Sequence, residues 1–150
     1  MELNGKTALV VGAGRGIGRF VAQLFSEAGA NLVLAARNEP ELMELEYKLT
    51  RKGHSNVLIC STDWRVESEV TELVSNSLER FESIDYLILS AGKGMLKEFE
   101  DTSLVEFEEL IRSNSTGAFL LLREVLPIMK KQRSGAVVAI PGGLGQTHLM

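Results

Sequence analysis

TALVVGAGRGIGRFVAQLF, residues 7–25, joins an apolar run to a cluster of glycines and then to a helical pattern. The run Thr7–Val11 has the composition of a buried strand, and apolar residues recur at helical spacing from Phe20 to Phe25. The glycines between them let the backbone approach a ligand closely, and the following helix offers unpaired N–H groups and a positive dipole end. The stretch therefore predicts an anion site at the first strand-to-helix turn of a dinucleotide-binding fold.

Strand and helix patterns alternate along the whole chain, which predicts one α/β domain over residues 1–150. The fold expected is a Rossmann-type doubly wound parallel sheet of about five strands in three α/β/α layers. The strands are nearly continuous apolar runs, as expected when helices cover both faces of the sheet. The expected strands are Thr7–Val11, Asn31–Ala36, Val57–Ser61, Tyr86–Ser90 and Ala136–Ile140. The expected helices are Ile17–Ala28, Glu39–Arg51, Glu67–Phe81 and a long helical region from Ser103 to Lys131.

Composition and charge argue against several classes of protein. The net charge is −4 without a long run of either sign, which disfavours nucleic acid or a membrane surface as a partner. No basic segment leads into an apolar one at the N-terminus, and no stretch has the roughly 20 apolar residues of a transmembrane helix. Cys60 is the only cysteine, so no internal disulfide can form, and a cytoplasmic location is expected. No metal site is expected.

The spacing of the glycines indicates which kind of dinucleotide site forms. The common G-x-G-x-x-G pattern would need its third glycine at Ile17. Gly12, Gly16 and Gly18 instead fit G-x-x-x-G-x-G, which resembles the short-chain dehydrogenase/reductase family, although Val11 replaces its usual Thr. The alternative is a glycine-rich turn that binds nothing. The loop residues that the resemblance assigns to the cofactor, mainly to its pyrophosphate, are Gly12, Gly14, Arg15, Gly16, Ile17 and Gly18.

The end of the second expected strand bears on which nucleotide binds. NAD sites place an acidic residue there, about 20 residues past the glycines, where it binds the ribose 2′-hydroxyl. Here that position is Ala36, followed by Arg37 and Asn38. Arg37 can pair with a 2′-phosphate through charge-assisted hydrogen bonds, and Arg15 can approach the same phosphate from the loop. The pair predicts NADP(H) over NAD(H), with Asn38 at the same end; otherwise both arginines are solvated surface charges.

Asp63 and Trp64 follow the third expected strand and resemble the Asp-Val or Asp-Leu pair of the family. There the carboxylate accepts a hydrogen bond from the adenine amino group, which implies this role for Asp63. The alternative is a cap on the helix over Glu67–Phe81. Trp64 departs from the small apolar residue usual at its position, so it either encloses the adenine pocket or packs locally.

Ser90, Ala91 and Gly92 follow the fourth expected strand and resemble part of the N-N-A-G segment of the family. Ala91 and Gly92 match, which implies a backbone that passes close to the adenosine ribose. Leu89 and Ser90 replace two asparagines that connect the central strands and border the cofactor. Ser90 can keep one such hydrogen bond, and Leu89 cannot.

Asn114 lies in SNSTGAF, residues 113–119, which resembles the N-x-x-G segment of the family. The resemblance implies that Asn114 lies in a middle helix, distorts it locally and holds a water in the catalytic proton relay. The alternative is a tolerated polar residue in a helix break, since Asn and Gly both weaken helices.

The chemistry of the family requires further residues. Hydride transfer to a carbonyl needs a proton donor, which in the family is a Tyr whose pKa is lowered by a Lys four residues later. A Ser after the fifth strand orients the substrate, and its position falls on Gly142. Neither Tyr47 nor Tyr86 has a lysine four residues later. The pair is expected beyond Met150, in a longer reductase of which this sequence is the N-terminal portion without the C-terminal strands; a short natural nucleotide-binding protein is the alternative.

Two functions from different classes remain open. The first is an NADP(H)-dependent short-chain oxidoreductase that acts on a carbonyl or alcohol, with Asn114 as its one catalytic-type residue in this sequence. The second is a non-catalytic nucleotide-binding or regulatory protein, which Val11, Leu89, Ser90 and Gly142 favour.

The helical pattern over Thr116–Lys131 carries apolar residues around much of its circumference, Phe119 and Leu126 among them. The corresponding helix forms part of a two-fold interface in the family, so the resemblance implies a homo-oligomer. Ordinary core packing is the alternative for the same side chains.

Overall fold

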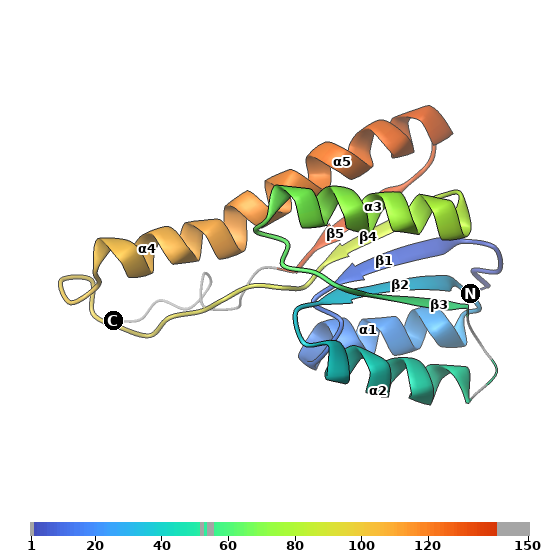
Figure 1. Ribbon diagram of the computed structural model, residues 1–150, viewed down its shortest axis with the longest axis horizontal. Coiled ribbons are helices and arrows are strands. Elements are labelled where there is room, and N and C mark those ends of the chain that lie inside the picture. The colour runs from blue at the N-terminus through green and yellow to red at the C-terminus, as the bar shows by residue number, and fades with distance from the viewer. Residues whose placement is uncertain (1, 52, 54–55, 141–150) are drawn as a thin grey trace.

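The computed structural model describes residues 2–51, 53 and 56–140, which form a five-stranded parallel sheet between two helical layers (Figure 1). The strands are β1 (Thr7–Val11), β2 (Asn31–Ala36), β3 (Val57–Ser61), β4 (Tyr86–Leu89) and β5 (Ala136–Ala139). The helices are α1 (Gly16–Glu27), α2 (Glu39–Thr50), α3 (Glu67–Phe81), α4 (Leu104–Ile111) and α5 (Gly117–Gln132). A π-helical turn, η1 (Arg112–Thr116), joins α4 to α5. These bounds confirm the expected elements to within one residue, and the long helical region divides at η1.

The strand order is β3-β2-β1-β4-β5, which confirms the doubly wound α/β arrangement. Val10, in the middle of β1, pairs with Leu34 of β2 on one side and with Ile88 of β4 on the other. The chain builds the sheet outward from β1 in one direction and then returns to add β4 on the other side. Ligands of such sheets bind at this reversal, outside the carboxyl ends of the strands.

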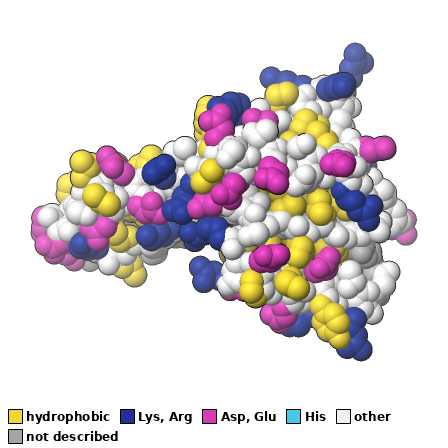
Figure 2. All heavy atoms as spheres, viewed as in Figure 1, with side chains coloured by type: hydrophobic (Ala, Val, Ile, Leu, Met, Phe, Trp, Pro, Cys, Tyr) yellow, Lys and Arg dark blue, Asp and Glu magenta, His cyan; other side chains and the backbone are white. Residues whose placement is uncertain are grey.

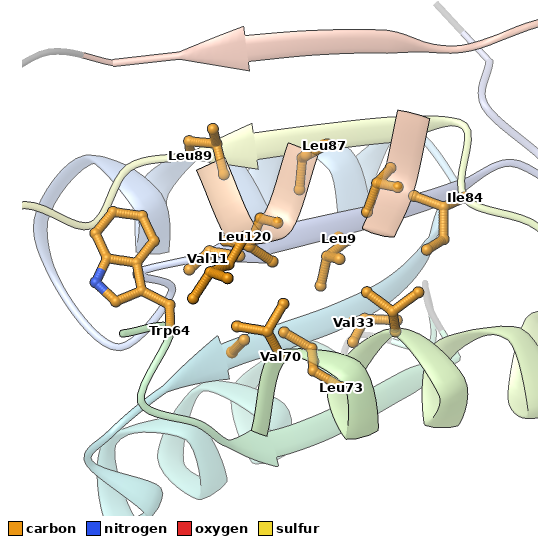
Figure 3. Close-up of a cluster of buried hydrophobic side chains, with 14 of the residues drawn as sticks. Leu9, Val11, Val33, Trp64, Val70, Leu73, Ile84, Leu87, Leu89 and Leu120 are labelled. Atoms are coloured by element: carbon orange, nitrogen blue, oxygen red, sulfur yellow. The ribbon is translucent and has the colours of Figure 1, made fainter. Parts of the chain in front are cut away.

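Successive residues of β1 contribute to two separate cores. Leu9 and Val11 pack with α3 and α5, and Leu120 of α5 lies in the same cluster (Figure 3). Ala8 and Val10 pack on the opposite face with residues of α1 and α2. This arrangement explains why β1 is apolar at nearly every position, because neither of its faces meets solvent.

The two edge strands differ from the expectation that every strand is covered on both faces. Residues of β3 are mostly half-buried, and β5 is exposed along its length. Val138 of β5 is 49% exposed, whereas Leu87 of the neighbouring β4 is completely buried. The expectation is therefore correct for β1, β2 and β4 and wrong for β5, since the described helices pack mainly over the other strands.

Helix α4 projects beyond the sheet, on the side where the strands end (Figure 1). Ser103 and Glu106 form a capping box at its first turn, and none of its residues is buried. Leu104, Phe107 and Ile111, which share one helix face, are between 45% and 68% exposed. Figure 2 shows hydrophobic side chains interspersed with acidic ones over this projecting part. Among the described helices, none combines the length and apolar character that crossing a bilayer requires.

Candidate functional site

The glycine loop between β1 and α1 packs closely against the segment that follows β4. Gly12 has φ +87°, and a Cβ at this position would lie 2.6 Å from the backbone nitrogen of Ala91. A Cβ at Gly18 would meet the Ser90 hydroxyl and the Gly12 carbonyl oxygen. These two glycines are therefore required by the packing of the protein on itself, before any ligand is considered.

Gly16 differs from both, because the space beside it is empty. Its φ is +58°, and beyond its chain neighbours and its own helix a Cβ there would meet no atom of the described residues within 4 Å. Helix α1 begins at Gly16, and its N-cap residue Arg15 makes no side-chain hydrogen bond to the first turn. Unpaired N–H groups at a helix N-terminus, next to open space, fit an anionic group such as a pyrophosphate. Ile17, also in this first turn, is 60% exposed.

Arg15 and Arg37 are exposed, and neither forms an ion pair with another residue in the part of the chain that the structure describes. Figure 2 shows Lys and Arg side chains gathered between the body of the domain and the projecting α4. Asn38 caps α2, where its Oδ1 accepts a hydrogen bond from the N–H of Glu41 at 3.3 Å. Neither guanidinium is thus neutralised by an ion pair among the described residues, although the charge of Arg37 adds to that of Arg65 in lowering the pKa of Asp63.

Arg19, which no sequence motif indicates, supports the loop. Its Nη1 donates to the carbonyl oxygen of Gly14 at 3.2 Å, and its Nη2 lies 3.1 Å from the carboxylate of Glu44. Arg19 therefore connects the glycine loop to helix α2. Glycine spacing alone cannot indicate this contact, because Glu44 belongs to a different element.

Asp63 is bound by Arg65, a second residue that no sequence motif indicates. The Arg65 Nε and Nη2 donate to the Asp63 carboxylate at 2.8 and 2.6 Å, and Nη1 donates to Glu109 of α4. The side-chain hydrogen bonds from Arg65 hold the pKa of Asp63 below its usual range. The helix-cap alternative for Asp63 is wrong, because the N-cap of α3 is Val66 and no side chain caps it.

Trp64 packs inside the protein. Its side chain belongs to the core between the sheet and α5, and only 7% of the residue is exposed (Figure 3). A Cβ at Gly117, the first residue of α5, would lie 3.0 Å from the indole ring. The bulky Trp64 and the small Gly117 therefore fit each other, and Trp64 also lines the pocket beside Asn114. Local packing accounts for its position, and a role beside an adenine stays a prediction.

Ser90 links the ends of the two central strands. Its hydroxyl donates to the carbonyl oxygen of Val11 at 2.8 Å, and its backbone N–H donates to the same oxygen at 3.0 Å. The side chain of Leu89 points into the core (Figure 3). The expectation that Ser90 keeps one connecting hydrogen bond and Leu89 none is confirmed.

Asn114 lies in the π-helical turn η1, which confirms that it occupies a distorted middle helix. Its Nδ2 donates to the carbonyl oxygens of Lys93 at 2.9 Å and Leu110 at 3.1 Å. Its Oδ1 accepts from the N–H of Lys93 at 3.0 Å. A Cβ at Gly92 would lie 2.7 Å from this Oδ1. Asn114 thus fastens the segment after β4 to the helix, and its role in a proton relay stays a prediction.

A pocket of about 330 Å³ opens beside Asn114, at the carboxyl ends of β4 and β5. Apart from Lys93 and Asn114, its lining offers mainly apolar side chains and glycine backbone. The described residues contain no group of three or more His, Cys, Asp or Glu placed to hold a metal ion. Gly142, the expected Ser position, lies outside the described residues. The lining residues are Trp64, Leu89, Ala91, Gly92, Lys93, Gly94, Asn114, Ala118, Ala139 and Ile140.

Comparisons with known proteins agree with this geometry. The family profile described as short chain dehydrogenase matches residues 6–150. An uncharacterized oxidoreductase of Staphylococcus aureus is 34% identical over 138 residues, which are 92% of this chain and 58% of that protein. The chain thus spans less than two thirds of the length of this curated relative.

Two solved structures show the same fold with different nucleotides bound. A 7α-hydroxysteroid dehydrogenase complexed with NADH and 7-oxo glycochenodeoxycholic acid matches with a TM-score of 0.93 and 28% identity, over 99% of this chain and 58% of that one. An alcohol dehydrogenase of the archaeon Thermococcus sibiricus, complexed with 5-hydroxy-NADP, matches with a TM-score of 0.85 and 30% identity, over 89% and 57% of the two chains.

Proposed function

Because the chain belongs to the short-chain dehydrogenase family, we propose that it forms the cofactor-binding part of an oxidoreductase that uses NADP(H) to interconvert a carbonyl and an alcohol. The observation that carries this proposal is the empty space at Gly16, beside the uncapped start of α1. The cofactor, when bound, supplies or accepts a hydride. The residues of this chain bind and orient it.

The charges around the loop favour the phosphorylated nucleotide. Arg15 and Arg37 form no ion pair within the described chain, and Ala36 offers no carboxylate at the end of β2. A guanidinium can form two charge-assisted hydrogen bonds with a 2′-phosphate. We assign the 2′-phosphate to these two arginines, with Asn38 beside them at the start of α2.

The adenosine end is assigned to Asp63 and to the segment after β4. The Asp63 carboxylate already accepts hydrogen bonds from the backbone N–H, Nε and Nη2 of Arg65, so an adenine amino group would share or replace one of them. Ala91 and Gly92 present backbone rather than bulky side chains to the ribose. Asn114 holds Lys93, and we assign it the water of the proton relay.

The test compares Gly16→Ala with Gly5→Ala. Both glycines have positive φ, and beyond their local backbone neither has an atom of the described residues within 4 Å of a Cβ, so alanine strains each backbone similarly, by about 1–2 kcal/mol. Only the methyl group at position 16 enters the proposed pyrophosphate space. In NADPH fluorescence titrations we expect wild type and Gly5→Ala to bind alike and Gly16→Ala to bind at least about tenfold more weakly. Equal binding by both variants would contradict the proposed site.

The apolar side chain of Leu89 supports a second candidate function, a nucleotide-binding protein without catalysis. Leu89 lines the pocket beside Asn114, but its side chain cannot offer the cofactor the hydrogen bonds that an asparagine would. The product of the intact gene, tested for NADPH oxidation with a panel of ketones and aldehydes, separates the candidates. Turnover supports the oxidoreductase, whereas NADPH binding without turnover supports the second candidate.

We also propose that the protein forms a homo-oligomer through the long helix made of α4, η1 and α5. Leu120, Val125 and Met129 of α5 are buried in the core, so they are not available to a partner. Phe119 remains 58% exposed, and Leu104, Phe107 and Ile111 of α4 add an apolar face without a covering element in the described chain. A second copy would bury this face.

A further inference from the structure

The first turn of helix α2 places a carboxylate against the glycine loop. A Cβ built on Gly14 would lie 2.5 Å from Oε2 of Glu41 and 3.6 Å from the Cβ of Ala36. One oxygen of Glu41 therefore lies at the corner where the loop meets the end of β2. The absence of a side chain at Gly14 is what gives the carboxylate this room.

This carboxylate has no partner in the described part of the chain. Glu41 is half-buried, and no lysine, arginine or hydrogen-bond donor pairs with its side chain. Its neighbour Glu44, by contrast, pairs with Arg19 and Lys48. The helix cap is supplied by Asn38, which accepts the N–H of Glu41. No hydrogen bond or ion pair among the described residues thus accounts for the placement of the Glu41 side chain.

We propose that Glu41 is a specificity-determining residue for the 2′ position of the adenosine ribose, and that it limits the preference for NADP(H). The proposal rests on the proposed function. Sites that bind NAD use a carboxylate at the end of the second strand to accept a hydrogen bond from the ribose 2′-hydroxyl. Ala36 lacks that carboxylate, and Glu41 brings one to the same corner from the next helix.

The negative charge of Glu41 determines which of the two nucleotides it favours. The 2′-hydroxyl of NAD(H) can donate a hydrogen bond to Glu41, which stabilises the unphosphorylated nucleotide. The 2′-phosphate of NADP(H) meets the same carboxylate as a like charge, which opposes binding. Arg15 and Arg37 attract that phosphate, so two cations compete with one anion. NADP(H) remains preferred, but the ratio of NADP(H) to NAD(H) affinity is smaller than the two arginines would give without Glu41.

The experiment measures NADPH and NADH affinities of the whole chain for wild type, Glu41→Gln and Glu39→Gln. Glu39→Gln is the matched control, because it removes the same charge from the same helix turn at an exposed position. We expect Glu41→Gln to raise the ratio of NADPH to NADH affinity about fivefold, with tighter NADPH and weaker NADH binding. Glu39→Gln is expected to leave the ratio within about twofold of wild type, because an exposed charge is more strongly screened.

Two further measurements keep the outcome decisive. Glu41→Ala removes the same charge by a different substitution, should the glutamine variant fold poorly. The gain in the ratio of NADPH to NADH affinity is also expected to shrink as the salt concentration is raised, because salt screens the repulsion. An unchanged ratio in folded Glu41 variants, or an equal change in Glu39→Gln, would overturn this inference while leaving the proposed function intact. Failure of wild type to bind either nucleotide would overturn both.

Discussion

Arg37 lies exposed directly after β2 and forms no ion pair within the described residues. If it binds the 2′-phosphate, Arg37→Gln removes charge-assisted hydrogen bonds and is expected to weaken NADPH binding about ten- to a hundredfold. NADH affinity is expected to stay within about twofold, because NADH lacks that phosphate. Arg51→Gln, which removes an exposed arginine at the other end of α2, is the control. Parallel fluorescence titrations of both nucleotides provide the measurement.

Asp85 is a residue whose importance is structural. Its carboxylate accepts hydrogen bonds from the Lys6 ammonium at 2.9 Å, the Thr7 N–H at 3.0 Å and the Ser83 hydroxyl at 3.1 Å. Burial alone would raise the pKa of Asp85, but these donors, the Thr7 N–H first among them, hold it below its usual range. A lowered pKa in the folded state means that the stabilisation is present above about pH 4 and is lost as the pH falls further.

Asp85→Asn is therefore expected to lower the free energy of unfolding by about 1–3 kcal/mol at pH 7. The difference between wild type and variant is expected to shrink as the pH falls from about 4 through the lowered pKa of Asp85. Urea denaturation of both proteins across this range is the measurement. A difference that stays constant down to pH 2 would show that the charge of Asp85 is not the source of the stabilisation.

The element that connects the site to the projecting helix is η1. Asn114→Ala removes the two hydrogen bonds that hold Lys93 and the one to Leu110. We expect faster amide hydrogen exchange at Lys93 by about tenfold, which corresponds to about 1.4 kcal/mol of local opening. Ser115→Ala, at an exposed neighbour in the same turn, is expected to leave that exchange rate unchanged. Exchange followed by mass spectrometry or NMR distinguishes the two variants.

At the scale of elements, the sequence alone predicted the position of nearly every strand and helix to within one residue. Apolar runs ended by glycines defined β1 and the start of α1, since each pattern is local. The sequence could not predict that the side chains of β5 are exposed, because Val137 and Val138 form an apolar run whether or not a helix lies over them. The supporting residues Arg19 and Arg65 were not predicted for a related reason, since each pairs with a glutamate of another element, Glu44 and Glu109 respectively, that only tertiary packing brings close.

At the scale of the whole molecule, the apolar face of α4 predicts association. Phe107 is 51% exposed on a helix without a buried residue, so Phe107→Glu leaves the core untouched. We expect wild type to sediment as an oligomer and the variant to shift toward monomer, with its dissociation constant raised at least about tenfold. Met43→Glu introduces the same charge at an exposed position of α2 and serves as control. Sedimentation equilibrium that finds wild type monomeric would refute the proposed interface.

The hydrogen bond from Ser90 to Val11 joins residues 79 positions apart, so it can form only late in the synthesis of the chain. A ribosome adds about 5–20 residues per second, so roughly 4–16 seconds separate the synthesis of the two partners. For most of that interval the apolar β1 has been made, but neither β4 nor the segment that packs against Gly12 exists. The nascent chain therefore carries the glycine motif before it can hold the loop in shape, and we expect nucleotide binding to begin only after Ala91 has left the ribosomal tunnel.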